Sequence, residues 1–152
     1  TRAEAVLRYR DGLASVANHA LERGVTILAE ALPKAQCDVV CTLAEAAEIV
    51  DYCNSPSIQT MFDVHNALDE TESHASLIRK YYSQIRHIHV NELDGKHCGK
   101  GDYDFKPLLA TLTELNYPGW VSLEAFDFSF GPDTIATESL NHLLAETERT
   151  TA

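Results

Sequence analysis

Four side chains that can ligate a metal ion recur at regular distances along the 152 residues. They are three carboxylates and one imidazole: Glu30, Asp63, His89 and Glu124. Each of them closes a short apolar or β-branched run, in the segments LAE, MFD, HIH and SLE. This oxygen-rich set suits Mn²⁺ or Mg²⁺ and can also hold Co²⁺ or Zn²⁺. The pattern therefore predicts a site for one divalent metal ion.

The spacing of these four residues indicates where they would meet. Successive intervals are 33, 26 and 35 residues, close to the roughly 31 residues per unit of an eight-unit (β/α)₈ barrel. In parallel α/β folds the carboxyl ends of the strands form one edge, and the loops there surround the site. We expect the four side chains to converge at that edge, although any one of them alone would be an ordinary polar residue at a strand end.

Hydrophobic periodicity predicts the elements that would position these side chains. We expect strands at 25–30, 58–63, 85–90 and 120–124, and helices at about 2–23, 42–54, 73–82, 104–116 and 132–148. Thr42 and Glu45 would form a capping box, and Asp104 would cap the fourth helix. One helix and four strand-and-helix units imply a parallel sheet with right-handed crossovers. Four units make half a barrel, although the spacing alone also allows an open four-stranded sheet.

Composition describes an ordinary globular chain and excludes some functions. Hydrophobic residues make up 45% of it, and 23 acidic residues against 12 basic ones give a net charge of −11. Such a chain lacks the positive surface that binds a phosphate backbone, so nucleic acid is not an expected partner. No apolar run approaches the roughly 20 residues that cross a bilayer, and the charged first ten residues do not form a signal peptide. We expect no membrane association and a cytoplasmic location.

The cysteines and the first residue bear on the organisation of the chain. The four cysteines form no CxxC pair, so we expect reduced thiols rather than disulfides or a structural zinc site. The sequence begins at Thr1 rather than Met, which suggests that a preceding portion is missing. We expect residues 1–152 to form a single domain, a partial barrel of the last four units without its N-terminal half.

Three stretches carry a resemblance to a known family. They read MFDVHNALDE at 61–70, IRHIHVNELDGKHCGKGDYDF at 85–105 and NYPGWVSLEAFDF at 116–128. The segment from 25 to 128 resembles the xylose isomerase-like TIM barrels, which include sugar phosphate isomerase/epimerases, ketose 3-epimerases, hydroxypyruvate isomerases and inosose dehydratases. The resemblance implies the C-terminal half of a (β/α)₈ TIM barrel, whose four strands give a Glu, an Asp, a His and a Glu to one metal. These positions match Glu30, Asp63, His89 and Glu124.

The resemblance also implies a reaction, proton transfer at a carbon beside a carbonyl. The metal would bind substrate oxygens and stabilise a developing enediolate. Glu30 and Glu124 would face the two sides of the substrate as an acid/base pair. We therefore expect a metal-dependent sugar isomerase or epimerase. Proton abstraction followed by loss of water, as in an inosose dehydratase, is the alternative, whereas the net charge of −11 opposes an endonuclease of the related DNA-repair branch.

Substrate contacts are implied less directly by the resemblance. Gln36 falls where ketose 3-epimerases carry a glutamate that contacts substrate, and Asn66 falls where they carry a histidine, with His65 just before it. Where they often carry an arginine, this chain has Gly95 followed by Lys96. We assign Gln36, His65, Asn66 and Lys96 as candidate substrate contacts, with a packed loop histidine and a solvated lysine as the alternatives for His65 and Lys96. The identity of the sugar stays open.

Two further features complete the expectations. His87 would lie one layer below His89 as a buried neighbour rather than a ligand, and Trp120 and Phe126 would be core or pocket wall. A parallel sheet of four strands leaves two edges unpaired and half of its interior face open. We therefore expect the chain to associate through these edges, with the missing half or with a second copy, and to be inactive alone. Partial disorder of the chain is the alternative to such association. A non-catalytic half-barrel fragment is the remaining alternative.

Overall fold

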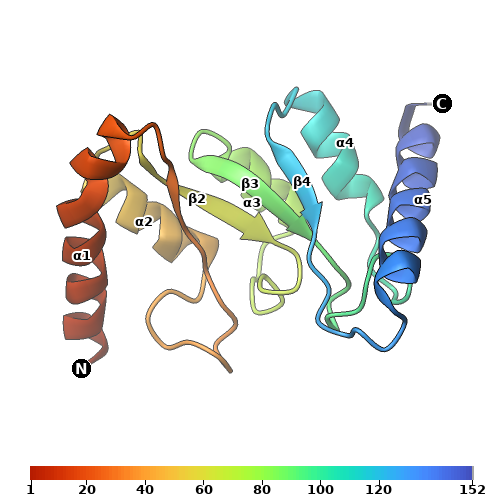
Figure 1. Ribbon diagram of the computed structural model, residues 1–152, viewed down its shortest axis with the longest axis horizontal. Coiled ribbons are helices and arrows are strands. Elements are labelled where there is room, and N and C mark those ends of the chain that lie inside the picture. The colour runs from red at the N-terminus through yellow and green to blue at the C-terminus, as the bar shows by residue number, and fades with distance from the viewer. Residues whose placement is uncertain (152) are drawn as a thin grey trace.

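The computed structural model describes residues 1–151, and side chains through residue 148 (Figure 1). Helices and strands alternate along the chain: α1 (Arg2–Glu22), β1 (Ile27–Ala29), α2 (Leu43–Cys53), β2 (Ile58–Asp63), α3 (His74–Tyr81), β3 (Ile85–Val90), α4 (Lys106–Glu114), β4 (Trp120–Leu123) and α5 (Pro132–Thr151). The strands form one parallel sheet in the order β1-β2-β3-β4. This confirms the expected α/β architecture of four parallel strands that alternate with helices.

The main hydrophobic core lies between the middle of the sheet and the helices α3 and α4. Phe62 of β2 and Ile88 of β3 pack there against Leu77 and Leu108, and all four are at most 2% exposed. Successive side chains of a strand point to opposite faces. Asp63 and His89, each one residue further along, therefore face away from this core.

The opposite face of the sheet is partly open in this chain. Trp120 of β4 pairs in register with His87 of β3, and its side chain is 79% exposed. Trp120 is expected in the core or in a pocket wall; within residues 1–151 it is not in the core, because β4 is an edge strand with only β3 as a neighbour. Figure 1 shows α1 beside α2 at one flank of the sheet and α5 at the other, so that the N and C ends lie far apart.

The helix termini correct two capping predictions. Helix α4 begins at Lys106 after Phe105, which makes no side-chain cap bond, so Asp104 is not the cap. Asp104 instead accepts a hydrogen bond from the Lys106 backbone N–H at 3.1 Å. Phe105 is 1% exposed in the main core, and Pro107 presets the first turn, so packing and proline geometry fix this start.

The capping box predicted for α2 forms only in part. The Thr42 hydroxyl accepts from the Glu45 backbone N–H at 3.2 Å, as a cap should. The Glu45 carboxylate, however, accepts from the N–H of Cys41 at 2.7 Å, one residue before the cap. The reciprocal box is instead found at the start of α1, between Thr1 and Glu4.

The outer strands are shorter than predicted. Ile27–Ala29 and Trp120–Leu123 each pair with one neighbour, so that Glu30 and Glu124 follow their strands directly. The Glu124 backbone N–H still donates to the Val90 carbonyl at 3.2 Å, which continues the ladder to this side chain. All four cysteines are free, as expected. Within residues 1–151 no helix is long and apolar enough to span a membrane.

The packing of Phe105 leads to a stability prediction. Replacing Phe105 by Ala in the full-length protein should lower the free energy of unfolding by about 3–5 kcal/mol, because a fully buried ring leaves a cavity. Urea denaturation measures this loss. Glu48→Ala is the control: Glu48 is exposed on the covering helix α2, and its removal should change stability by no more than about 0.5 kcal/mol. Equal losses for the two variants would contradict the packing described.

Candidate metal centre

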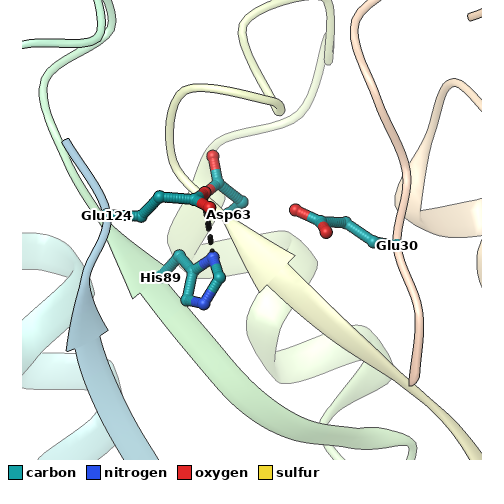
Figure 2. A group of neighbouring side chains, drawn as sticks. All are labelled: Glu30, Asp63, His89 and Glu124. Atoms are coloured by element: carbon teal, nitrogen blue, oxygen red, sulfur yellow. Dashed lines mark hydrogen bonds and ion pairs between the residues drawn. The ribbon is translucent and has the colours of Figure 1, made fainter. Parts of the chain in front are cut away.

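Strand register brings the predicted metal ligands together. Asp63 of β2 lies opposite His89 of β3, and His89 lies opposite Ser122 of β4, two residues before Glu124. Glu30 extends from the end of β1, and Figure 2 shows the two glutamates approaching from opposite sides with Asp63 and His89 between them. One potential ligand atom from each of the four residues lies within 4.8 Å of all the others. The four residues share one small region at the carboxyl edge of the sheet.

His89 is the centre of the contacts within this group. Its Nδ1 lies 3.0 Å from Glu124 Oε2 and 3.4 Å from Asp63 Oδ2. The Asp63 side chain has no exposed surface, the Glu124 side chain is 37% exposed, and Glu30 is half-buried. The group is therefore enclosed at Asp63 and more open at the glutamates.

Two buried asparagines orient the carboxylates. The Asn66 side chain donates to Glu30 Oε1 at 2.8 Å, and its backbone N–H donates to Asp63 Oδ1 at 2.7 Å. The Asn91 side chain donates to Asp63 Oδ2 at 3.2 Å and accepts from the His65 backbone N–H at 2.8 Å. Neutral amides can satisfy carboxylate oxygens without adding charge. Sequence reasoning missed Asn91, whose one signal was its position just beyond β3, two residues after His89.

The crowding of acids shifts the proton affinities of the group. Burial raises the pKa of Glu30, opposed by the hydrogen bond from Asn66 and assisted by the charges of Asp63 and Glu124. Burial also raises the pKa of Glu124, with Asp63 adding to the effect. Burial would raise the pKa of Asp63 too, but hydrogen bonds, first from His89 and then from Asn66, lower it overall. The bond to Asp63 in turn raises the pKa of His89.

The donor set fits a divalent cation. Among residues 1–148, no lysine or arginine pairs with Glu30, Asp63 or Glu124, and the cationic partner described for the group is His89. Three carboxylates beside one imidazole keep an excess of negative charge, which is costly when partly buried without compensation. Carboxylate oxygens with one imidazole nitrogen are ligands that Mn²⁺ and Mg²⁺ accept. The chemistry and geometry of this group are therefore those of a candidate metal site.

The candidate substrate residue His65 lies beside the group but not on the strand. Strand β2 ends at Asp63 and a turn follows, so the alternation does not continue to His65. The His65 Nδ1 instead bonds the Leu93 carbonyl at 2.7 Å, and its ring packs 5.0 Å from that of Phe126. His65 is half-buried, and its backbone N–H is joined to Asp63 through the side chain of Asn91.

The remaining predicted residues lie in different surroundings. Gln36 is exposed in a turn of the loop after β1, and no described contact joins its side chain to the metal ligands. Lys96 pairs with its neighbour Asp94 at 2.6 Å. His87 is half-buried with its ring perpendicular to that of His89 at 5.0 Å, and burial lowers its pKa. It lies outside the group of four potential ligands.

Comparison with known families decides which barrel family this architecture represents. Residues 1–146 match the family model described as xylose isomerase-like TIM barrel. The chain belongs to this family. A D-psicose 3-epimerase from Enterocloster bolteae is 28% identical over 137 residues, covering 90% of this chain and 44% of that protein. An inosose dehydratase from Clostridium perfringens is 23% identical over 109 residues, covering 57% of this chain and 37% of that protein.

Solved structures agree with the fold. A D-psicose 3-epimerase crystallised in the presence of D-fructose superposes with a TM-score of 0.87 at 22% identity. The superposition covers all of this chain and 58% of that one. The chain therefore spans about half the length of the family members it matches. Its distant relatives are sugar epimerases and inosose dehydratases.

The central position of His89 leads to a first prediction for the site. In the full-length protein, Mn²⁺ at 100 times its Kd should stabilise the fold by about 2.7 kcal/mol, because the ion binds only the folded form. His89→Ala should remove this stabilisation, measured as the difference in Tm with and without Mn²⁺. His87→Ala is the matched control and should keep it. A wild-type Tm that does not respond to Mn²⁺ would contradict the metal site.

The pKa shifts lead to a prediction for pH. Only neutral His89 can ligate, and its pKa is raised above the ordinary value of about 6.5. The raised pKa values of Glu30 and Glu124 act in the same direction. Mn²⁺ affinity should therefore rise with pH from about 5.5 to 8, with uptake of the ion accompanied by release of protons. Titration calorimetry in two buffers of different ionisation enthalpy measures the affinity and the number of protons released. An affinity that does not change with pH would refute the assignment of these residues as metal ligands.

Proposed function

We propose that the intact protein is a divalent-metal-dependent isomerase or epimerase that acts on a small hydroxy-carbonyl compound, a ketose or related sugar. The approach of Glu30 and Glu124 from opposite sides to the point shared by Asp63 and His89 is the observation that carries the proposal (Figure 2). The membership of sugar epimerases among the relatives gives it further support. We take Mn²⁺ or Mg²⁺ as the ion, from the donor set.

The residues divide the chemistry between them. A divalent ion held by Glu30, Asp63, His89 and Glu124 would supply positive charge to the substrate carbonyl and so acidify the neighbouring C–H. One glutamate takes the proton from that carbon, and a glutamate on the opposite side returns it. Positioned carboxylates are among the side chains that carry out such proton transfers. Asn66 holds Glu30 in place through its 2.8 Å hydrogen bond.

His65 is the substrate contact that its surroundings favour most. Because a carbonyl oxygen only accepts, the 2.7 Å bond to Leu93 requires a proton on His65 Nδ1. In the neutral ring Nε2 then carries the lone pair, which can accept a hydrogen bond from a sugar hydroxyl. We propose this role for His65 and propose that Asn66 acts through Glu30. The assignments of Gln36 and Lys96 as substrate contacts stay predictions.

A lyase remains the second candidate. The match to inosose dehydratases covers more than half of this chain. The same carboxylate would remove the proton, and the opposite one would protonate a departing hydroxyl instead of the carbon. The two reactions therefore share their first step and differ in where the second proton goes.

We propose that the two outer strands pair with four further strands to close a barrel. Each outer strand has one neighbour, Trp120 is largely exposed beside the β4 edge, and the chain spans about half of its relatives. A second copy could also cover these edges, but it would bring a second set of three carboxylates to the same rim, where like charges repel. Residues 1–152 would then be one part of a catalytic domain, and alone a non-catalytic fragment.

Four free thiols agree with a reducing, cytoplasmic location.

The proposed reaction predicts a requirement for both glutamates. Glu30→Gln and Glu124→Gln should each lower turnover by about 10² to 10⁴, since each removes one acid/base group. The measurement is exchange of the proton beside the carbonyl, followed by NMR in D₂O with Mn²⁺ and a panel of ketoses and inososes. Glu48→Gln, on an exposed position of α2, is the matched control.

The outcomes of this experiment separate the candidates. An isomerase or epimerase is supported if the proton exchanges while the sugar keeps its elemental composition, with or without equilibration between epimers. The lyase is supported if exchange is accompanied by loss of water. Absence of exchange across the panel in the full-length protein would refute both. Appreciable turnover by residues 1–152 alone would contradict the proposed need for four further strands.

A further inference from the structure

A hollow lies at the other end of the sheet, around the turns that lead into β3 and β4. Its volume is about 460 Å³, and its lining is mainly apolar, from Tyr82, Ile85, Tyr117 and Pro118, with Arg86 as the one charged side chain. Ile85 begins β3 and His89 lies four residues further on, which separates the hollow from the carboxylates by roughly 13 Å. The hollow is therefore separate from the candidate metal centre.

Arg86 is a solvent-exposed side chain that brings a positive charge to this hollow. Its Nη1 donates to the carbonyls of Ser83 at 2.8 Å and Ile85 at 3.1 Å. No acidic residue pairs with it among residues 1–148, although acids outnumber bases 23 to 12 in the sequence. An adjoining hollow of about 350 Å³ is lined by both Arg86 and Asp51. The Asp51 carboxylate accepts a hydrogen bond from the Gln84 side chain at 2.6 Å and does not pair with Arg86. The guanidinium therefore keeps donors for a ligand.

Tyr117 adds a polar group without a partner. Its hydroxyl is buried and makes no hydrogen bond within the described residues. The hydroxyl lies against Gly119, where an added Cβ would come within 2.3 Å of it. Burial raises the pKa of Tyr117 to about 12, and the charge of Arg86 opposes this shift, as expected for groups that lie near each other. The phenol therefore stays protonated, and it can donate to a ligand once the chain at Gly119 shifts to uncover it.

We propose that this hollow binds a small carboxylate with an apolar ring. A carboxylate has two oxygens that match the fork of a guanidinium, and it accepts a hydrogen bond from a phenol. The apolar body would lie along Tyr82, Ile85 and Pro118, and the volume is that of ordinary small-molecule sites. In (β/α)₈ barrels the chemistry is carried out at the carboxyl edge, so this site is for binding rather than catalysis.

Benzoate is a suitable probe, with benzamide as its neutral counterpart of nearly the same shape. The full-length protein, in EDTA so that no metal is present to hold the carboxylate, should bind benzoate with a Kd of about 1 mM in titrations followed by NMR. Arg86→Gln should raise the Kd for benzoate at least about tenfold. Benzamide, which carries no charge, should bind the wild-type protein with a similarly raised Kd. Arg79→Gln is the matched control, because that exposed arginine pairs with Glu114 at 2.7 Å and should not affect binding.

Tyr117→Phe separates a ligand contact from a structural role. Removing a buried hydroxyl that has no partner should leave Tm unchanged or higher, while the Kd for benzoate rises about threefold or more. A lower Tm with unchanged Kd would overturn the role given to Tyr117. The site itself would be overturned by the absence of saturable binding up to about 10 mM. It would also be overturned by equal binding to wild type and Arg86→Gln, or by binding that needs Mn²⁺, which would assign benzoate to the carboxylate group.

Discussion

Mutual repulsion among three partly buried carboxylates is the constraint on which the functional edge of this structure depends. Glu30, Asp63 and Glu124 share one small region, and no lysine or arginine of residues 1–148 pairs with them. Such an arrangement is unfavourable unless hydrogen bonds and a cation compensate it. His89, held between Asp63 and Glu124, compensates part of the charge. The negative charge that remains makes the group suited to a divalent ion. Repulsion among the carboxylates therefore both opposes folding and supports the proposed chemistry.

The loops that follow the strands are held by buried polar anchors rather than by regular structure. Asn91 joins the loop after β3 to Asp63 and to the turn at His65. Glu92, 1% exposed, accepts from the backbone N–H groups of Gly99 at 2.7 Å and Tyr103 at 3.0 Å. A Cβ at Gly101 would lie 2.6 Å from the Glu92 carboxylate, so this close approach requires glycine. These contacts set the positions of the backbone around the site before any ligand binds.

The two ends of the sheet differ in chemistry. At the carboxyl end, acids gather in excess and are open to solvent at the glutamates. At the amino end, an apolar hollow meets an arginine without an acidic partner and a phenol without a hydrogen bond. We propose that the first end binds a cation and the second an anion. The length of β3 from Ile85 to His89 separates the two ends.

The sequence by itself determined the order of elements, the parallel sheet and the type and spacing of the four potential ligands. These follow from periodicities of two and about 3.6 residues, which are local properties of the chain. It could not give the capping of α4, because Phe105 is fixed by burial in the core rather than by Asp104. Nor could it give the roles of Asn66 and Asn91 or the turn at His65, since their partners lie on other loops. Tertiary structure alone decided these contacts, because a hydrogen bond between two loops exists only once the strands beneath them are packed in register.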